Sequence, residues 1–247
     1  MSSAEPFVLK APLSIIYQDE YIVAVDKPSG MLVHRSFLDK HETVFVMQTL
    51  RNQLGQHVFP VHRLDKVTSG LIILARSSRA AAELTALFTA HQVEKYYLAL
   101  SVGRSAKKQG WIKGDMVPSR RSAWKLLNSQ HNPAVTYFVS RGYDELPFRA
   151  YLLKPFSGKT HQIRVAMKSL GAAISGDVLY QAEMADRVYL HAYALQFTLS
   201  GQQYQYVRPP KCGDKFQQLL QHDGLSEWRL PWQLSWPEYK QPKQVNR

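Results

Sequence analysis

Residues 61–70 read Val-His-Arg-Leu-Asp-Lys-Val-Thr-Ser-Gly, and residues 71–75 read Leu-Ile-Ile-Leu-Ala. A short aliphatic run that follows a glycine is typical of a buried β-strand, and the polar residues before it are typical of a loop. We therefore expect His62, Arg63 and Asp65 to lie on a loop that the core anchors, which is where proteins often present reactive groups. From these residues alone, a surface ion pair between Arg63 and Asp65 is an equally simple interpretation.

The sequence on both sides is rich in short strands and poor in long helices. Apolar runs predict strands at residues 15–17, 21–25, 31–34, 93–100, 133–139 and 148–155. Helical spacing of apolar residues predicts helices over 43–54 and from a cap at Ser77 or Ser78 to about residue 91. No β-α-β rhythm is present, so we expect an α+β domain with a mixed, largely antiparallel sheet.

Two adjacent tyrosines in the predicted strand 93–100 must face opposite ways. Alternation along a strand places Tyr96, Leu98 and Leu100 on one face, and it places Tyr97 with Ala99 and Ser101 on the other. One tyrosine is therefore expected in the core, while the other faces a cleft or solvent. Aromatic residues are common in strands, so the pair alone does not indicate a site.

Composition restricts the class of protein. The chain has 247 residues, of which 45% are hydrophobic and 20% charged, and it is long enough to bury a substantial core. No run of about 18 apolar residues is present, and residues 1–6 lack the pattern of a signal peptide. The single cysteine, Cys212, excludes an internal disulfide and a multi-cysteine metal site. We expect a cytoplasmic, monomeric protein with no membrane partner.

Charge favours a polyanionic partner. The formal net charge is +12, and residues 104–125, called the basic segment below, hold seven basic residues against one acidic residue. Trp111 and Trp124 lie within the basic segment, and cations interleaved with aromatic rings suit an RNA backbone with exposed bases. The alternative is a solvated hairpin whose tryptophans pack inward.

Two tempting ligand sites are rejected on spacing. Gly158-Lys159-Thr160 resembles the end of a phosphate-binding loop, but position 153, where that motif requires its first glycine, is leucine. His161 and His191 lack neighbours with metal-ligand spacing, so structural histidines are expected. A metal-dependent RNA hydrolase using Asp26 and Asp65 would require a cluster of acidic residues that the sequence lacks.

Four motifs together resemble the RluA-type RNA pseudouridine synthases. His62-Arg63-Leu64-Asp65, continuing into Thr-Ser-Gly-Leu, is similar to the catalytic signature of that family, and residues 27–30 are similar to its Lys-Pro-x-Gly turn. Lys95-x-Tyr97 before Leu-Ala-Leu is similar to the second motif. Residues 158–164 are similar to the third motif, with Lys159 in place of an arginine. The resemblance covers about residues 13–210 and departs from the family at Ser200-Gly201, where His-Pro is usual.

The resemblance implies the pseudouridine synthase fold, with a cleft across a central sheet, and the isomerisation of uridine to pseudouridine without a cofactor or metal. It makes Asp65 the catalytic carboxylate, Arg164 its cationic partner, and Tyr97 the residue that stacks on the target base and helps with proton removal. An arginine beside a buried carboxylate keeps it ionised. The expected RNA-binding residues are His62, Arg63, Lys107, Lys108, Arg120 and Arg121, with Arg63 filling the space that an extruded base leaves.

The RNA target is the least determined expectation. Residues 32–58 are similar to the tRNA-modifying branch of the family, whereas the later motifs are shared with enzymes that act on 23S ribosomal RNA. We expect the substrate to be a structured RNA, with tRNA favoured. Residues 13–210 are expected to form the catalytic domain that acts on it. Residues 1–12 are expected to be a flexible lead-in, and residues 211–247 a tail that packs on the domain or docks a partner. A non-catalytic RNA-binding module is the alternative of another class, and the complete set of Asp65, Tyr97 and Arg164 opposes it.

Overall fold

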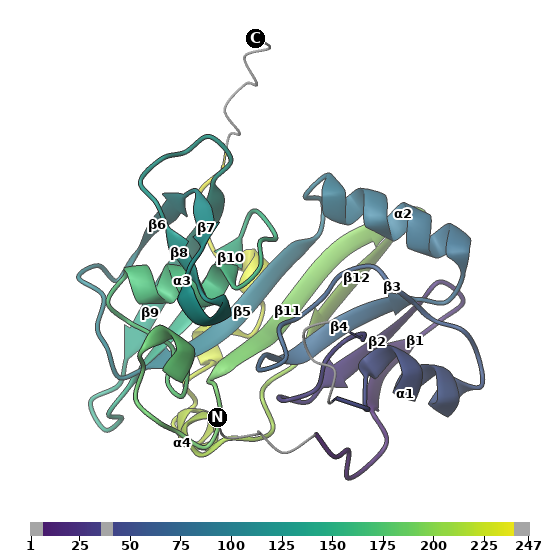
Figure 1. Cartoon of the computed structure of the whole chain (residues 1–247), viewed down its shortest axis with the longest axis horizontal. Coiled ribbons are helices and arrows are strands. Elements are labelled where there is room, and N and C mark those ends of the chain that lie inside the picture. The colour runs from purple at the N-terminus through teal and green to yellow at the C-terminus, as the bar shows by residue number, and fades with distance from the viewer. Residues whose placement is uncertain (1–6, 36–41, 240–247) are drawn as a thin grey trace.

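A strongly twisted sheet of ten strands forms the centre of the molecule (Figure 1). This computed structural model describes residues 7–35 and 42–239. The strand order is β1-β2-β4-β11-β5-β10-β9-β6, with β3 beside β4 and β12 beside β11. The strands are β1 (Ser14–Gln18), β2 (Ile22–Lys27), β3 (Phe59–Pro60), β4 (Ser69–Ala75), β5 (Glu94–Ser101), β6 (Gln109–Gly114), β9 (Ala134–Gly142), β10 (Arg149–Pro155), β11 (Leu190–Leu199) and β12 (Gln202–Val207). This mixed, mostly antiparallel sheet with separate helices is the α+β class expected from the sequence.

Four helices and a small two-stranded sheet surround the central sheet. The helices are α1 (Val46–Leu54), α2 (Ser78–Thr89), α3 (Gln162–Ser169) and α4 (Asp214–Gln221), and the small sheet pairs β7 (Met116–Pro118) with β8 (Trp124–Leu126). Short 3₁₀ turns cover Arg120–Ser122, Val178–Tyr180, Ser226–Trp228 and Pro231–Gln233. Among the described residues, no helix is long and apolar enough to cross a membrane.

The strand that carries the opening motif is buried from end to end. Every residue of β4 is buried, which agrees with the core strand predicted from the aliphatic run. β4 pairs with β11 in parallel, while all other paired strands in the described part of the chain run antiparallel. Gly70 makes this pairing possible, because a Cβ atom there would lie 2.3 Å from the carbonyl oxygen of Ala192.

Alternation along β2 separates the helices of the N-terminal half. Val23 and Val25 belong to a cluster with residues of α1, whereas Ile22 and Ala24 belong to a cluster with Ala80 and Leu84 of α2. Because successive side chains point to opposite faces of a sheet, α1 and α2 cover opposite faces of this part. The hydroxyl oxygen of Ser77 accepts a hydrogen bond from the backbone N–H of Ala80, which confirms the predicted helix cap.

The C-terminal half has its own large core cluster. This cluster joins residues of β5, β10 and α3 to Phe216 and Leu219 of α4 and to Trp228. Beyond α4, the indole of Trp236 lies 5.6 Å from the ring of Tyr96, measured between centroids. The described part of the tail therefore packs on β5.

Two local predictions were wrong. Residues 31–34 form no strand: only an isolated bridge joins Leu32 to Phe45. The backbone N–H groups of Val46 and Met47 bond the carbonyls of Leu32 and Val33, so this segment instead supports the start of α1. For the same reason α1 begins at Val46 and not at residue 43.

Candidate active site

A cavity of about 370 Å³ lies between the loop before β4, the end of α2, and the segment that enters α3. Its wall includes His62, Arg63 and Asp65 of the opening motif and Tyr97 of β5. Residues 157–162 close the opposite side. The sequence motifs, which lie about 30 to 60 residues apart, therefore meet around one hollow.

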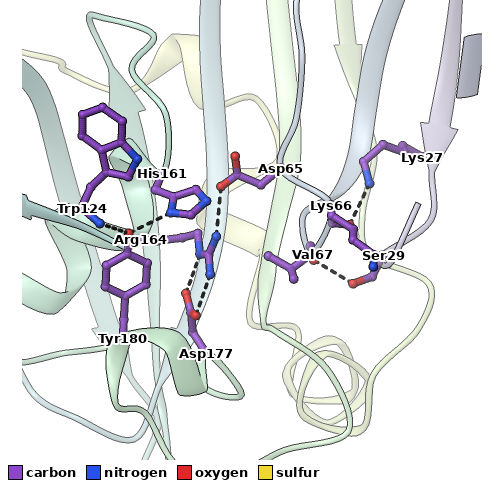
Figure 2. A network of polar contacts seen from close by, with 10 residues as sticks. All are labelled: Lys27, Ser29, Asp65, Lys66, Val67, Trp124, His161, Arg164, Asp177 and Tyr180. Atoms are coloured by element: carbon purple, nitrogen blue, oxygen red, sulfur yellow. Dashed lines mark hydrogen bonds and ion pairs between the residues drawn. The ribbon is translucent and has the colours of Figure 1, made fainter. Parts of the chain in front are cut away.

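Asp65 and Arg164 approach each other, although their contact is a loose one. The Nη1 atom of Arg164 lies 3.5 Å from Oδ2 of Asp65. Arg164 is bound much more closely by Asp177, with Nε–Oδ2 and Nη2–Oδ1 distances of 2.7 and 2.9 Å. Arg164 therefore bridges two carboxylates, those of Asp65 and Asp177 (Figure 2).

This bridge leaves Asp65 as the accessible end of the group. The side chain of Asp65 is 18% exposed, whereas those of Arg164 and Asp177 are 6% and 2% exposed. Burial disfavours the charge on Arg164, but the hydrogen bonds and charge of Asp177, with a smaller contribution from Asp65, raise its pKa above the ordinary value. A fixed cation thus lies behind a carboxylate that a substrate can reach.

Main-chain contacts hold the Asp65 loop in place. The ammonium of buried Lys27 donates to the carbonyl oxygens of Pro28, Met31 and Lys66, at 2.9, 2.6 and 3.2 Å. The hydroxyl of Ser29 donates to the carbonyl of Val67 at 2.7 Å (Figure 2). Burial lowers the pKa of Lys27 to about 7, although the charge of Asp65 opposes this shift. The Lys-Pro-x-Gly turn therefore supports the loop that carries Asp65.

His62 has a structural contact that the sequence did not indicate. Its Nε2 atom accepts a hydrogen bond of 3.0 Å from the backbone N–H of Ile73 in β4, and its ring stacks on Phe88 at 4.6 Å between centroids. The imidazole thus accepts the hydrogen bond of a β4 backbone N–H that lies between the part of β4 paired with β11 and the part paired with β3. Burial, with a contribution from Lys95, lowers the pKa of His62 to about 3, so the ring stays neutral and can accept this bond. A direct contact of His62 with RNA stays a prediction.

The two tyrosines of β5 face as alternation predicts. Tyr96 is fully buried and packs in the core, whereas Tyr97 lines the cavity. Burial, and then the charge of Asp65, raise the pKa of Tyr97, so its phenol keeps its proton at neutral pH. Tyr97 therefore offers a ring and an O–H group to anything that enters the cavity.

His161 lines the cavity, and its ring is held by a hydrogen bond. Its Nδ1 atom lies 2.9 Å from the hydroxyl of Tyr180, which accepts a hydrogen bond of 3.1 Å from the backbone N–H of Trp124. Burial lowers the pKa of His161, and the charge of Asp65 opposes the shift. This chain of bonds connects the basic segment to the wall beside Asp65 (Figure 2).

Gln162 explains part of the third motif. Its amide nitrogen donates to the carbonyl of Val135 and to the hydroxyl of Thr136, both at 3.0 Å. Its amide oxygen accepts from the Ser157 hydroxyl and the Lys159 backbone N–H, both at 2.9 Å. One buried amide thus ties the cavity wall to β9, and it fixes the start of the helix that carries Arg164.

His191, in contrast, fits the predicted structural role. The ring is buried, with Nδ1 at 2.7 Å from the Ser69 hydroxyl and Nε2 at 2.7 Å from the carbonyl oxygen of Arg208. Burial is the largest cause that lowers the pKa of His191, to about 4. A neutral ring satisfies both partners, and it anchors Ser69 at the start of β4.

The basic segment runs along β6, at the edge of the central sheet, and continues into the small sheet of β7 and β8. Its predicted RNA contacts, Lys107, Lys108, Arg120 and Arg121, are exposed and have no ion pair within the part of the chain that the structure describes. Trp111 packs against Tyr137, with centroids 5.0 Å apart. The inward alternative thus holds for Trp111, while the charged side chains face solvent.

The acidic residues do not form a metal site in the described ranges 7–35 and 42–239, where no group of three His, Cys, Asp or Glu residues could hold an ion. Asp26 instead pairs with Arg208, at 2.7 Å between Oδ2 and Nε. It is therefore engaged elsewhere and does not join Asp65 in a two-carboxylate site.

Comparison with known proteins agrees with this arrangement. Residues 21–169 match a family model described as RNA pseudouridylate synthase. A protein of Haemophilus influenzae named uncharacterized RNA pseudouridine synthase is 46% identical over 187 residues, which cover 75% of this chain and 82% of that protein. The tRNA pseudouridine synthase C of Vibrio cholerae is 39% identical, covering 87% of this chain and 97% of that protein. The solved structure of human RNA pseudouridylate synthase domain containing 1 matches with a TM-score of 0.68 at 26% identity, covering 84% of this chain and 86% of that one.

Proposed function

Since the chain belongs to the RNA pseudouridylate synthase family and is an isomerase that acts on RNA, we propose that it converts a specific uridine of tRNA to pseudouridine with Asp65 as the catalytic carboxylate. The observation that carries the assignment of Asp65 is its place in the cavity, where it is partly exposed and backed by the guanidinium of Arg164 at 3.5 Å. Asp177 is too deeply buried for the same role, with 2% of its side chain exposed.

The reaction breaks the bond between N1 of uracil and C1′ of ribose, rotates the base, and forms a bond from C1′ to C5; C5 then loses its proton and N1 gains one. An ionised carboxylate beside the sugar is the group that this exchange requires. In our proposal Asp65 supplies it, the guanidinium of Arg164 lies beside its negative charge, and Asp177 fixes the plane of the guanidinium so that one Nη atom faces Asp65. Tyr97 holds the uracil through its ring.

A uridine stacked within an RNA helix hides its glycosidic bond, so the target nucleotide must leave the stack. Arg63 lines the cavity and is exposed, which suits it to occupy the vacated position. The exposed cations of the basic segment then contact the backbone of the same RNA. Phosphate contacts of this kind position the RNA and leave the chemistry to the cavity.

The choice of tRNA rests on the relatives. Several similar proteins are named tRNA pseudouridine synthase C, and the match to that of Vibrio cholerae spans almost the whole of both chains. Residues 32–58 also resemble the tRNA-modifying branch of the family. Modification of 23S ribosomal RNA is the outcome that would replace this choice.

Pseudouridine mapping tests the proposal. Total RNA from a strain that lacks the protein is compared with RNA from the same strain carrying either the wild type or Asp65→Asn. We expect one site or a small set of sites in tRNA to be lost, then restored by the wild type but not by Asp65→Asn. Restoration by Asp65→Asn contradicts the catalytic assignment, and a site lost only from ribosomal RNA replaces the proposed target.

A further inference from the structure

Lys95, at the start of β5, is one of three Lys and Arg residues among the described residues that line the cavity. Lys95 lines the cavity, and among the described residues no carboxylate lies within 4 Å of its ammonium and no hydrogen bond to it is found. By contrast, Lys27, Lys154 and Lys215 bind carbonyl or carboxylate oxygens. Burial of an unpaired cation opposes folding, so Lys95 is a group that the fold itself does not require.

The position of Lys95 follows from the register of β5. Lys95 and Tyr97 are two residues apart and therefore share one face of the strand, about 7 Å apart along it. The ammonium of Lys95 lies 5.7 Å from the centroid of the Phe88 ring, which belongs to α2. Lys95 thus occupies the α2 end of the cavity, and Asp65 with Arg164 occupies the α3 end.

The electrostatics of this end favour an anion. Phe88, His62 and His91 surround the ammonium, and the charge of Lys95 contributes to the lowered pKa of both histidines after their own burial. Asp65 is the one acidic residue among the described residues that line the cavity, against Arg63, Lys95 and Lys159. The α2 end therefore presents a positive charge within a half-enclosed, largely uncharged wall, where a charge-assisted contact is strong.

We propose that Lys95 forms a phosphate-binding subsite of the cavity, which holds a backbone phosphate of the same nucleotide whose uracil lies beside Tyr97. This inference rests on the proposed function. A nucleotide places its phosphate one ribose away from C1′, so a sugar beside Asp65 directs a phosphate along β5 towards Lys95. Lys95 then acts on binding and on the placement of the ribose, while Asp65 remains the reacting group.

A kinetic comparison tests this role. RNA labelled with tritium at C5 of uridine releases tritium when C5 bonds to C1′, so it reports turnover wherever in the RNA the modified uridine lies. With bulk labelled RNA from a strain lacking the protein, we expect Lys95→Met to raise KM about tenfold, with a smaller change in kcat. The salt dependence of KM should weaken by about 0.7 to 0.9 in log–log slope, the effect of one phosphate contact.

Two further variants make the comparison specific. Lys211→Met removes one charge from an exposed lysine remote in the sequence from the cavity walls, and it should leave KM and its slope nearly unchanged. Lys95→Arg keeps the charge and should recover most of the affinity. The melting temperature of Lys95→Met should equal or exceed that of the wild type, because an unpaired buried charge is removed. Equal KM values for Lys95→Met and Lys211→Met, or a clear loss of stability in Lys95→Met, would overturn the subsite.

A binding measurement separates this inference from the proposed function. Calorimetric titration compares uridine with uridine 3′,5′-bisphosphate as the probe, with wild type and Lys95→Met. We expect the wild type to prefer the bisphosphate and Lys95→Met to lose most of that preference. The same preference in both proteins contradicts the subsite even if the wild type releases tritium. An absence of tritium release by the wild type contradicts the proposed function, whatever the calorimetry gives.

Discussion

The cavity and the basic segment carry positive charge in opposite ways. Beside the cavity, Arg164 lies between Asp65, which lines it, and the buried Asp177, and the Arg164 side chain is 6% exposed. In the basic segment, Lys107, Lys108, Arg120 and Arg121 face solvent, and within the described ranges none of them forms an ion pair. The fold itself supplies the partners of Arg164, whereas the cations of the basic segment are accessible to another molecule.

This difference teaches where chemistry and affinity reside. A buried charged side chain that is ion-paired is held in one conformation, because the core fixes its partners. It can therefore stabilise a defined group in a reaction. Exposed lysine and arginine side chains can adopt many conformations, because little contact with the fold constrains them. They suit the phosphates of a polyanion, which add affinity and salt dependence but carry no chemistry.

Removal of the buried guanidinium should have the largest effect. Arg164→Met leaves Asp177 buried without its partner, so we expect most activity to be lost and the free energy of unfolding to fall by about 3–5 kcal/mol. Chemical denaturation and tritium release measure the two effects. Arg141→Met, which breaks an exposed pair with Glu227, is the control and should change stability by less than about 1 kcal/mol. Similar stability losses in the two variants would remove the distinction between buried and exposed charge.

The tyrosine pair sharpens the comparison within the cavity. Tyr97→Phe keeps the ring that faces the cavity but loses its hydroxyl, so we expect a fall in the single-turnover rate of about 10²-fold with RNA affinity unchanged. Tyr96→Phe alters a core residue whose hydroxyl bonds Glu94, and it should leave the rate nearly unchanged. The opposite ranking would mean that Tyr96, and not Tyr97, acts on the substrate.

The pH dependence of the free energy of unfolding tests the role of buried His191. Its folded-state pKa of about 4 lies below the ordinary value of about 6.5, so between these values the unfolded chain binds more protons. Stability is therefore complete above about pH 6.5 and falls on acidification towards pH 4, by up to about 1.4 kcal/mol per pH unit from this residue. His191→Gln should be less stable at pH 7 yet show a shallower decline. Equal slopes for the variant and the wild type would show that His191 does not titrate in this way.

The basic segment should show the smallest effect per residue. With Lys107, Lys108, Arg120 and Arg121 all changed to Ala, we expect the salt dependence of RNA binding to weaken by about 0.7 to 0.9 in log–log slope for each phosphate that is no longer neutralised. The rate at saturating RNA should persist. A control with the same charge change alters Arg51, Arg79, Lys211 and Arg229 to Ala. An equal weakening in the control would assign the effect to net charge and not to this segment.

The sequence was most informative where one chain segment determined its own structure. The aliphatic run after Gly70 predicted the buried strand β4, and alternation in β5 predicted which tyrosine faces the cavity. The family resemblance also implied that Arg164 lies near Asp65, as it does. These predictions depend on local periodicity, or on motifs whose meeting point the family resemblance implied.

The contacts that were not predicted join separate segments of the chain. No local sequence pattern indicates that these segments meet. Asp177 binds Arg164 from a turn after α3, and nothing in the spacing ranks it above Asp65 as the closer partner. His62 fills a gap in the hydrogen bonding of β4, which becomes visible only when β3 and β11 are in register. The sole signal for Asp177 was its place in a Gly-Asp turn within the region of resemblance.

The most direct test measures chemistry and affinity on the same proteins. The single-turnover rate at saturating RNA and the Kd at fixed salt are determined for the wild type, for Asp65→Asn, and for the fourfold variant of the basic segment. We predict that Asp65→Asn abolishes the rate while its Kd stays within a few-fold of the wild type, and that the fourfold variant binds more weakly but reacts at a nearly normal rate. A substantial rate in Asp65→Asn, with tritium released from C5, would contradict the account.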